Sequence, residues 1–345
     1  MDIQKHFNRR DFLKVTGMAG LAGMAFAGGI ASPAFASTRT DVASPAITDL
    51  FFYNQSIGRG EFYGTDGLGN INHLSTYSAL PKSLTQILSG KFIFGSPFEG
   101  MLLYDNVQGT GTFYGAGRNG SLDLINHQTG WRKSWTHIVN GHFVDNGIAY
   151  KFFDGLLFYE GSTGVGEFYS TDGLGHIQLL RHDIWSKNWT KIIPGPFTFG
   201  TPLTGLFFYD QPHGIGAFYG TDGSGGIFLL KRHTGLRTTW TTIITTPFGL
   251  LFYEAHSGVS EFYRTDGQGG LHLQKHDIWS KGWTHIVSSM NFVFGSEIGG
   301  LLFYNSNTGV SAFYRYNDAE GNISLMHRAT WSKGWTRILE NATIQ

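Results

Sequence analysis

The sequence predicts an all-β fold, a six-bladed β-propeller built from four-stranded antiparallel blades. Glycine makes up 49 of the 345 residues and aromatic residues 15%, while charged residues reach only 14%. This composition is typical of many short strands joined by tight turns. The second observation is a six-fold internal repeat. The third is that no repeated unit shows the 3.6-residue periodicity of a helix.

The repeat is marked by aromatic residues at fixed places. A phrase like Leu-Leu-Phe-Tyr ends at six tyrosines spaced 44 to 55 residues apart: Tyr53, Tyr104, Tyr159, Tyr209, Tyr253 and Tyr304. Ten residues after each comes a tyrosine preceded by phenylalanine: Tyr63, Tyr114, Tyr169, Tyr219, Tyr263 and Tyr314. Each copy ends with Thr-x-Ile, which follows Leu84, Trp135, Trp189, Trp240, Trp283 and Trp335. A fixed period of this kind indicates a repeat architecture.

Each unit is predicted to form four short strands, which in the third repeat are residues 156–159, 166–169, 177–180 and 189–193. The Thr-Asp-Gly-Leu-Gly stretch at 171–175 is a hairpin signal, because Asp-Gly readily takes positive φ angles. The first strand is apolar at consecutive positions, which predicts burial on both faces. Blades stacked radially around an axis provide that burial. An open β-solenoid is the alternative, although its repeats are usually shorter and it needs end caps.

The N-terminal residues 1–36 resemble a Tat-type signal peptide. Arg9 and Arg10 begin the pattern R-R-x-F-L-K, an apolar stretch covers 15–30, and Ala-Phe-Ala at 34–36 supplies a cleavage signal. The alternative is a chance arginine pair before a buried helix. We expect Tat export to the periplasm or the extracellular space, and a short leader at 37–48. The propeller is then 49–345, with repeats near 49–98, 99–154, 155–204, 205–248, 249–299 and 300–345.

Charge and cysteine content exclude several function classes. Residues 1–36 carry four of the 25 basic and two of the 25 acidic residues, which leaves 21 and 23, a net charge of −2. With no basic cluster, nucleic acid is not an expected partner. No second long apolar stretch predicts membrane insertion once the signal is removed. The chain has no cysteine, which excludes disulfides, thiolate catalysis and cysteine-bound metal. We expect neither a metal nor a cofactor.

The candidate binding residues lie in the loop that follows the third strand of each repeat. HDIWSKNWT at 182–190 and HDIWSKGWT at 276–284 differ at one position. The predicted ligand-binding residues are Trp131, Trp185, Trp279, Trp331, His182, Asp183, His276 and Asp277. An indole face can stack on the apolar face of a sugar while neighbouring polar groups bind its hydroxyls. The alternative is that these tryptophans only pack blade against blade and that the histidines are structural.

Three glutamates recur on the second strand, Glu61, Glu167 and Glu261. Because the other repeats have Thr112, Ala217 and Ala312 at this position, we interpret the glutamates as charges on a sheet face.

The layout over residues 49–339 resembles the tachylectin-2 and PLL-type propeller lectins. The shared features are tandem units of this length, Phe-Tyr strands, a glycine turn and spaced tryptophans. The resemblance implies sugar binding between or on the blades, with glycans or glycoconjugates as partners. It predicts a secreted, non-enzymatic, multivalent carbohydrate-binding propeller.

Two alternatives remain open at this stage. One is a protein-interaction or surface-structural propeller. The other is a cofactor-bearing periplasmic enzyme, for which the sequence offers no nucleophile elbow, no His-Glu-x-x-His and no phosphate-binding glycine loop. The sequence does not indicate the oligomeric state.

Overall fold

A computed structural model describes residues 37–39, 48–93, 100–117, 119–145 and 153–341. These residues form strands and turns, and none of them is helical. Accordingly, the described part of the chain contains no helix long and apolar enough to cross a membrane. Arg9 and Arg10, and with them the expected signal peptide, lie outside the described residues. All strands described below belong to one compact unit.

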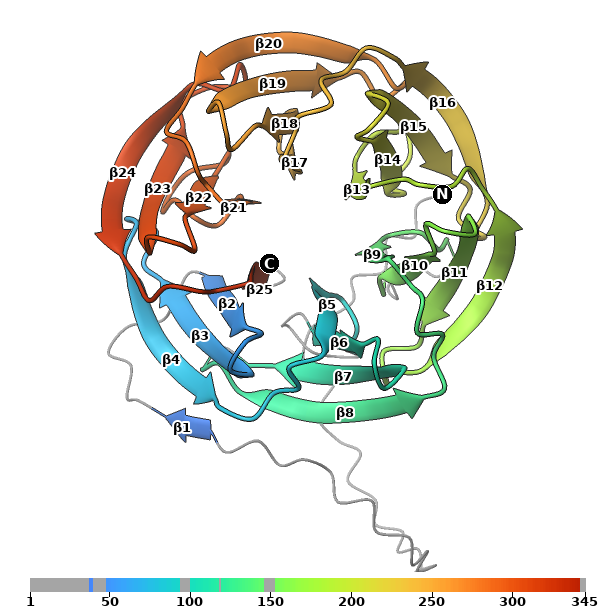
Figure 1. The fold of residues 1–345 in the computed structure, drawn as a ribbon, viewed down its shortest axis with the longest axis horizontal. Helices are drawn as coiled ribbons and strands as arrows, with labels where there is room; N and C mark the ends of the chain where they lie inside the picture. The colour runs from blue at the N-terminus through green and yellow to red at the C-terminus, as the bar shows by residue number, and fades with distance from the viewer. Residues whose placement is uncertain (1–36, 40–47, 94–99, 118, 146–152, 342–345) are drawn as a thin grey trace, which may run out of the picture. The chain divides into compact units, whose positions relative to one another are not determined.

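The strands form six antiparallel sheets arranged as blades around a common centre (Figure 1), which confirms the predicted six-bladed propeller. Blade one contains β25 (Arg337–Asn341), β2 (Thr48–Asn54), β3 (Arg59–Thr65) and β4 (Ile71–Tyr77), with β1 (Ser37–Arg39) added outside β4. Blade two contains β5 (Leu84–Gly90), β6 (Gly100–Asp105), β7 (Thr110–Ala116) and β8 (Leu122–Thr129). Blade three contains β9 (His137–Gly141), β10 (Gly155–Tyr159), β11 (Val165–Thr171) and β12 (Ile177–Ile184).

The other three blades follow the same order from the centre outward. Blade four contains β13 (Lys191–Gly195), β14 (Gly205–Asp210), β15 (Ile215–Thr221) and β16 (Ile227–His233). Blade five contains β17 (Thr242–Thr246), β18 (Gly249–Tyr253), β19 (Val259–Thr265) and β20 (Leu271–Ile278). Blade six contains β21 (His285–Ser289), β22 (Gly300–Tyr304), β23 (Val310–Tyr316) and β24 (Ile323–Thr330).

Blades and sequence repeats are offset by one strand. The Thr-x-Ile strand that ends each repeat pairs with the first strand of the next repeat and becomes the innermost strand of that blade, as β13 does with β14. The HDIWSKNWT phrase is therefore the link between blades three and four, whereas we had expected a loop within one blade. The same offset closes the ring, because C-terminal β25 pairs with N-terminal β2.

The core is divided into six apolar clusters, one between each pair of adjacent blades. The Leu-Leu-Phe-Tyr strands supply their centres, and β10 is buried along its whole length. Burial on both faces follows because each blade packs against two neighbours. The consecutive apolar residues that predicted this burial are thus explained by the radial arrangement.

Candidate functional site: pockets between adjacent blades

Each of the four link tryptophans packs between two blades. Its ring stacks on the tyrosine that ends the second strand of its own blade, with centroids 6.1 to 6.3 Å apart. Its edge or face meets a phenylalanine of the next blade, as Trp185 meets Phe208 at 5.8 Å. Trp131, Trp185, Trp279 and Trp331 all remain partly accessible to solvent. Leu80 and Leu236 occupy this place after blades one and four.

The backbone of each link is fixed by the same tyrosine. The Tyr159 hydroxyl donates to the carbonyl oxygen of Ser186 at 2.7 Å, directly after Trp185. The Trp185 amide donates to the carbonyl of Gly164 at 2.8 Å, so the link lies against the loop between β10 and β11. Aromatic side chains on both sides therefore fix the position of each tryptophan. Part of each indole remains exposed to solvent.

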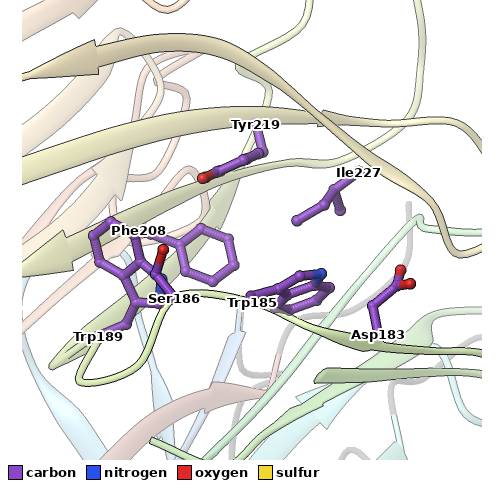
Figure 2. A pocket seen from close by; sticks show the side chains of 7 residues that line it. All are labelled: Asp183, Trp185, Ser186, Trp189, Phe208, Tyr219 and Ile227. Carbon is purple, nitrogen blue, oxygen red and sulfur yellow. The ribbon is translucent and has the colours of Figure 1, made fainter. Parts of the chain in front are cut away.

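The pocket between blades three and four has a volume of about 290 Å³ and contains Asp183, Trp185 and Ser186 on one side. Tyr219 and Ile227 of blade four lie across from them (Figure 2). An equivalent pocket of about 330 Å³ lies between blades five and six. Its lining includes Asp277, Trp279 and Tyr314. The structure thus brings each predicted aspartate and tryptophan of the repeated phrase into one pocket.

The histidine of the repeated phrase lies on the opposite face of its blade from the aspartate that follows it. Asp183 forms an ion pair with Arg181 at 2.7 Å, and Asp277 with Lys275 at 2.9 Å. His182 instead points to the opposite face of blade three, where its Nδ1 lies 2.9 Å from Glu167 Oε1. His276 makes the matching contact to Glu261 at 3.1 Å. Successive residues of a strand alternate between its faces, which separates His182 from its neighbour Asp183.

The residue that sequence analysis missed is Glu167. We had interpreted it only as a charge on a sheet face, but it is 7% exposed and lines a pocket of about 400 Å³ between blades two and three. Its other carboxylate contacts are the Tyr169 hydroxyl, which donates to Oε2 at 2.6 Å, and Arg132 Nη2 at 3.3 Å from Oε1. Trp131 lines the same pocket. The sequence signal that could have revealed Glu167 is an acid that recurs at one position of an otherwise apolar strand. Such an acid is expected to be buried with the strand, and buried acids are rare unless they are paired.

The electrostatics of this pocket follow from its ion pairs. Arg132 bridges Glu167 and Glu160, with Nη1 3.3 Å from Glu160 Oε2, and its guanidinium lies over the Trp135 ring. The side-chain hydrogen bond from Ser134, joined by those from Thr163 and Arg132, holds the pKa of Glu160 below its usual value. Burial, the hydrogen bond to Glu167 and the charge of that carboxylate together raise the pKa of Tyr169. Tyr169 therefore stays a protonated donor at neutral pH.

The six junctions are not chemically equal. Between blades four and five, Glu261 contacts Tyr263 at 2.6 Å and Arg237 at 3.6 Å as well as His276, but Leu236 replaces the tryptophan. In blade one, Glu61 is 3% exposed, pairs with Arg59 and Tyr63, and lies opposite Thr76 on the neighbouring strand, where Glu167 and Glu261 lie opposite histidines. Between blades three and four and between five and six, alanines stand at the glutamate position. At the junction between blades two and three, a glutamate bonded to histidine, tyrosine and arginine shares a pocket with a tryptophan.

Within the described ranges, no group of three or more histidine, aspartate or glutamate side chains is placed to hold a metal ion.

The fold is shared with solved propellers of known names. The chain is similar to a putative 6-phosphogluconolactonase from Bacteroides fragilis, at 13% identity and a TM-score of 0.51 over 84% of this chain and 82% of that one. It is similar to a putative 6-phosphogluconolactonase from Bacteroides uniformis, at 12% identity and a TM-score of 0.53 over 85% of this chain and 99% of that one. It is also similar to the periplasmic gluconolactonase of Pseudomonas aeruginosa, at 12% identity and a TM-score of 0.52 over 86% of each chain. No family model matches the chain, and no curated protein matches it.

These comparisons establish the fold, and they contradict the predicted function. The predictions of a non-enzymatic lectin and of a chain that is not an enzyme are both wrong, because these three neighbours are named as gluconolactonases or 6-phosphogluconolactonases and none of them as a lectin. The physical reason is that the resemblance rested on layout. Repeat length, glycine turns and aromatic strands specify how a propeller packs, and a fold does not specify a function.

Proposed function

We propose that the chain is a hydrolase of a small cyclic ester, a lactone, and that the ester opens in the pocket between blades two and three. The observation that carries this proposal is the buried carboxylate of Glu167, held at once by His182, Tyr169 and Arg132 beside a cavity. Buried ionisable groups with specific partners in a concave pocket are the usual mark of an active site. The lactone class follows the names of the structural neighbours.

His182 is the general base in this proposal. With its proton on Nδ1, the imidazole donates to Glu167 Oε1, and Nε2 is left to accept a proton from water. The His182 side chain is 46% exposed, so water reaches it. The water oxygen bonds to the ester carbonyl carbon and Nε2 takes its proton. The ring C–O bond then breaks, the proton passes to the leaving alkoxide, and the product is an open-chain hydroxy acid.

The other residues position the substrate and stabilise charge. Arg132 is 41% exposed in its side chain, which leaves guanidinium N–H groups available for the carbonyl oxygen as negative charge develops on it. Tyr169 fixes the second carboxylate oxygen and so holds the imidazole orientation through Glu167. Trp131 provides a flat apolar wall for the substrate ring. The junction with Glu261 and His276 is a second, less complete site, because it lacks the tryptophan.

The experiment is a hydrolysis assay by pH-stat on purified protein with gluconolactone and other aldonolactones. We expect turnover above the buffer rate in the wild type and loss of it in the double variant E167Q/E261Q. E61Q is the matched control, since Glu61 is also buried but lies opposite Thr76 and not opposite a histidine, and it should keep wild-type turnover. Absence of lactone hydrolysis in the wild type, or full activity in E167Q/E261Q, would overturn the proposal.

We also propose that residues 1–36 direct export through the Tat pathway and that the mature chain begins near Ser37, with the leader and propeller bounds given above. The twin arginines followed by an apolar stretch and Ala-Phe-Ala support this proposal. Fractionation followed by N-terminal mass spectrometry tests it. The processed chain should lie outside the cytoplasm, and the R9K/R10K variant should be retained inside at full length. Export of that variant would contradict the proposal.

A further inference from the structure

The centre of the propeller is surrounded by six equivalent side chains that no part of the proposed mechanism uses. They are the middle residues of the six Thr-x-Ile phrases: Gln86, His137, Lys191, Thr242, His285 and Arg337. Each lies at or near the start of an innermost strand, β5, β9, β13, β17, β21 or β25, and these strands encircle the centre (Figure 1). None of the six is acidic. We call these residues the central ring.

Five of the six side chains of the central ring form a hydrogen bond to the next blade. Gln86 Nε2 donates to the carbonyl of Thr136 at 3.1 Å, and His137 Nε2 lies 3.0 Å from the carbonyl of Thr190. Lys191 Nζ donates to the carbonyl of Thr241 at 2.8 Å. His285 contacts the carbonyl of Thr336, and Arg337 Nη2 donates to that of Thr85 at 3.1 Å. Only Thr242 makes no such bond among the described residues.

The ring is narrow enough for a long side chain on an innermost strand to reach the axis. Neighbouring innermost strands approach within 8 Å between Cα atoms all the way around. In a ring of six, the distance to the centre equals the distance between neighbours, so the strands lie within about 8 Å of the axis. A lysine or arginine side chain covers most of that distance. Lys191 and Arg337 each use one or two donors on carbonyl oxygens and keep others free.

Within the described residues, no carboxylate forms an ion pair with Lys191 or Arg337. Burial and the neighbouring charge of Lys191 lower the pKa of His137, and burial and the charge of Arg337 lower that of His285. Lys191 and Arg337 thus each disfavour a positive charge on the histidine of the neighbouring blade. A negative ion at the axis would relieve this repulsion and engage the free donors.

We propose that the central ring binds a small oxyanion, a phosphate or carboxylate group, on the propeller axis. The site is independent of the lactone pocket, because it uses innermost strands and not the junction side chains around Glu167. The proposal is also supported by the sequence: the middle residue of each Thr-x-Ile phrase is never an acid, and the fold brings the six middle residues together around the centre.

The test uses Thr242, the ring member whose side chain makes no contact to the next blade. The T242E variant adds a carboxylate to the ring without removing a hydrogen bond, and T242Q is its neutral control of the same size. Thermal unfolding is followed with inorganic phosphate, citrate, and chloride at matched ionic strength. Comparing variants removes the general stabilisation that phosphate gives to proteins.

We expect saturating phosphate to raise the Tm of the wild type and of T242Q by about 2–5 °C beyond chloride. T242E should respond to phosphate no more than to chloride. K191M should lose at least half of the response, whereas K187M, at an exposed lysine of a link between blades, should keep it. A response to citrate extends the site to carboxylates, and a response to phosphate alone restricts it to phosphate groups. A full response in T242E and K191M, or none in the wild type, would overturn the proposal.

Discussion

Individual buried charges distinguish the junctions of this propeller from one another. Burying a carboxylate costs free energy unless partners satisfy it, and Glu167 has three. The same strand position carries Ala217 in blade four and Ala312 in blade six, so packing alone does not demand an acid there. A buried acid that the fold can do without, placed at the wall of a cavity, is therefore best understood as part of a chemical site.

The role of His182 can be tested in the E261Q background, in which only the pocket between blades two and three should remain active. H182Q should lower lactone turnover there by about 10²- to 10⁴-fold, because the general base is lost. Its free energy of unfolding should change by less than about 1 kcal/mol, since a half-exposed side chain contributes little packing. Steady-state kinetics with a denaturant titration measure both quantities. Unchanged kcat would show that water is activated elsewhere.

For individual residues, the sequence predicts which side chains pack in the core better than it predicts which polar side chains contact each other. The tryptophans could be placed between blades because each follows a strand at a fixed offset, but the partner of His182 could not. That partner depends on the strand pairing, in which Glu167 lies opposite His182 across β11 and β12. A bulge at Phe168 and Tyr169 shifts this register, and no residue pattern in the sequence predicts a bulge at that place.

Among the structural elements, the hairpins between the second and third sequence strands fix each blade to the preceding one. The second glycine of Thr-Asp-Gly-x-Gly has a positive φ in the hairpins that have this phrase, and Gly175 has φ +79°. A side chain at Gly175 would come within 2.7 Å of Asn126 in blade two. The turn sequence that predicted a hairpin thus also specifies a contact between blades, which the sequence alone could not show.

Replacing Gly175 with alanine should destabilise the protein by about 2–4 kcal/mol, from backbone strain and from the collision with Asn126. Gly235 is the matched control, because its φ is +77° but no atom lies within 4 Å of the added Cβ. G235A should cost only about 1 kcal/mol. Urea denaturation of both variants measures the difference. Equal losses would mean that the hairpin contact contributes nothing to stability.

Strand β25 carries a buried acid whose ionisation should be visible in the pH dependence of stability. Glu340 accepts hydrogen bonds from Ser289, from Thr48 at 3.2 Å and from Asn291 at 3.3 Å. Burial nevertheless raises its pKa. The native state then binds this proton more tightly than the unfolded state, so its contribution is favourable at low pH and is lost as pH rises through the folded pKa.

As the pH rises above 4.5, the usual pKa of a glutamate, the wild type should therefore lose stability relative to E340Q, whose amide stays neutral. Guanidinium titrations of the two proteins at several pH values give this difference directly. If the two stability curves run parallel across the range, the desolvation of Glu340 does not affect folding.

At the scale of the whole molecule, stability depends on closing the ring. Each blade takes its innermost strand from the preceding repeat, and blade one takes β25 from the C-terminus. The six-fold repeat was enough to predict the propeller. The closure could not be predicted, because the sequence units could be cut at any strand and still repeat.

A chain ending at Thr336 lacks β25 and should lose cooperative thermal unfolding or drop in Tm by more than about 15 °C, because β2 then lacks its inner neighbour. A chain ending at Asn341 keeps β25 whole and should behave as the full chain does. Calorimetry compares the two. A truncated chain as stable as the control would show that the ring does not need this closure.

A crystal structure with a bound lactam, in which a ring amide replaces the ester and resists hydrolysis, would test directly whether lactones bind between blades two and three. We expect electron density for the lactam between Trp131 and Glu167. The carbonyl oxygen of the lactam should point toward Arg132, and its carbonyl carbon should face a water molecule bound to His182. Density only at the centre of the propeller, with the pocket between blades two and three empty in a protein that hydrolyses lactones, would contradict it.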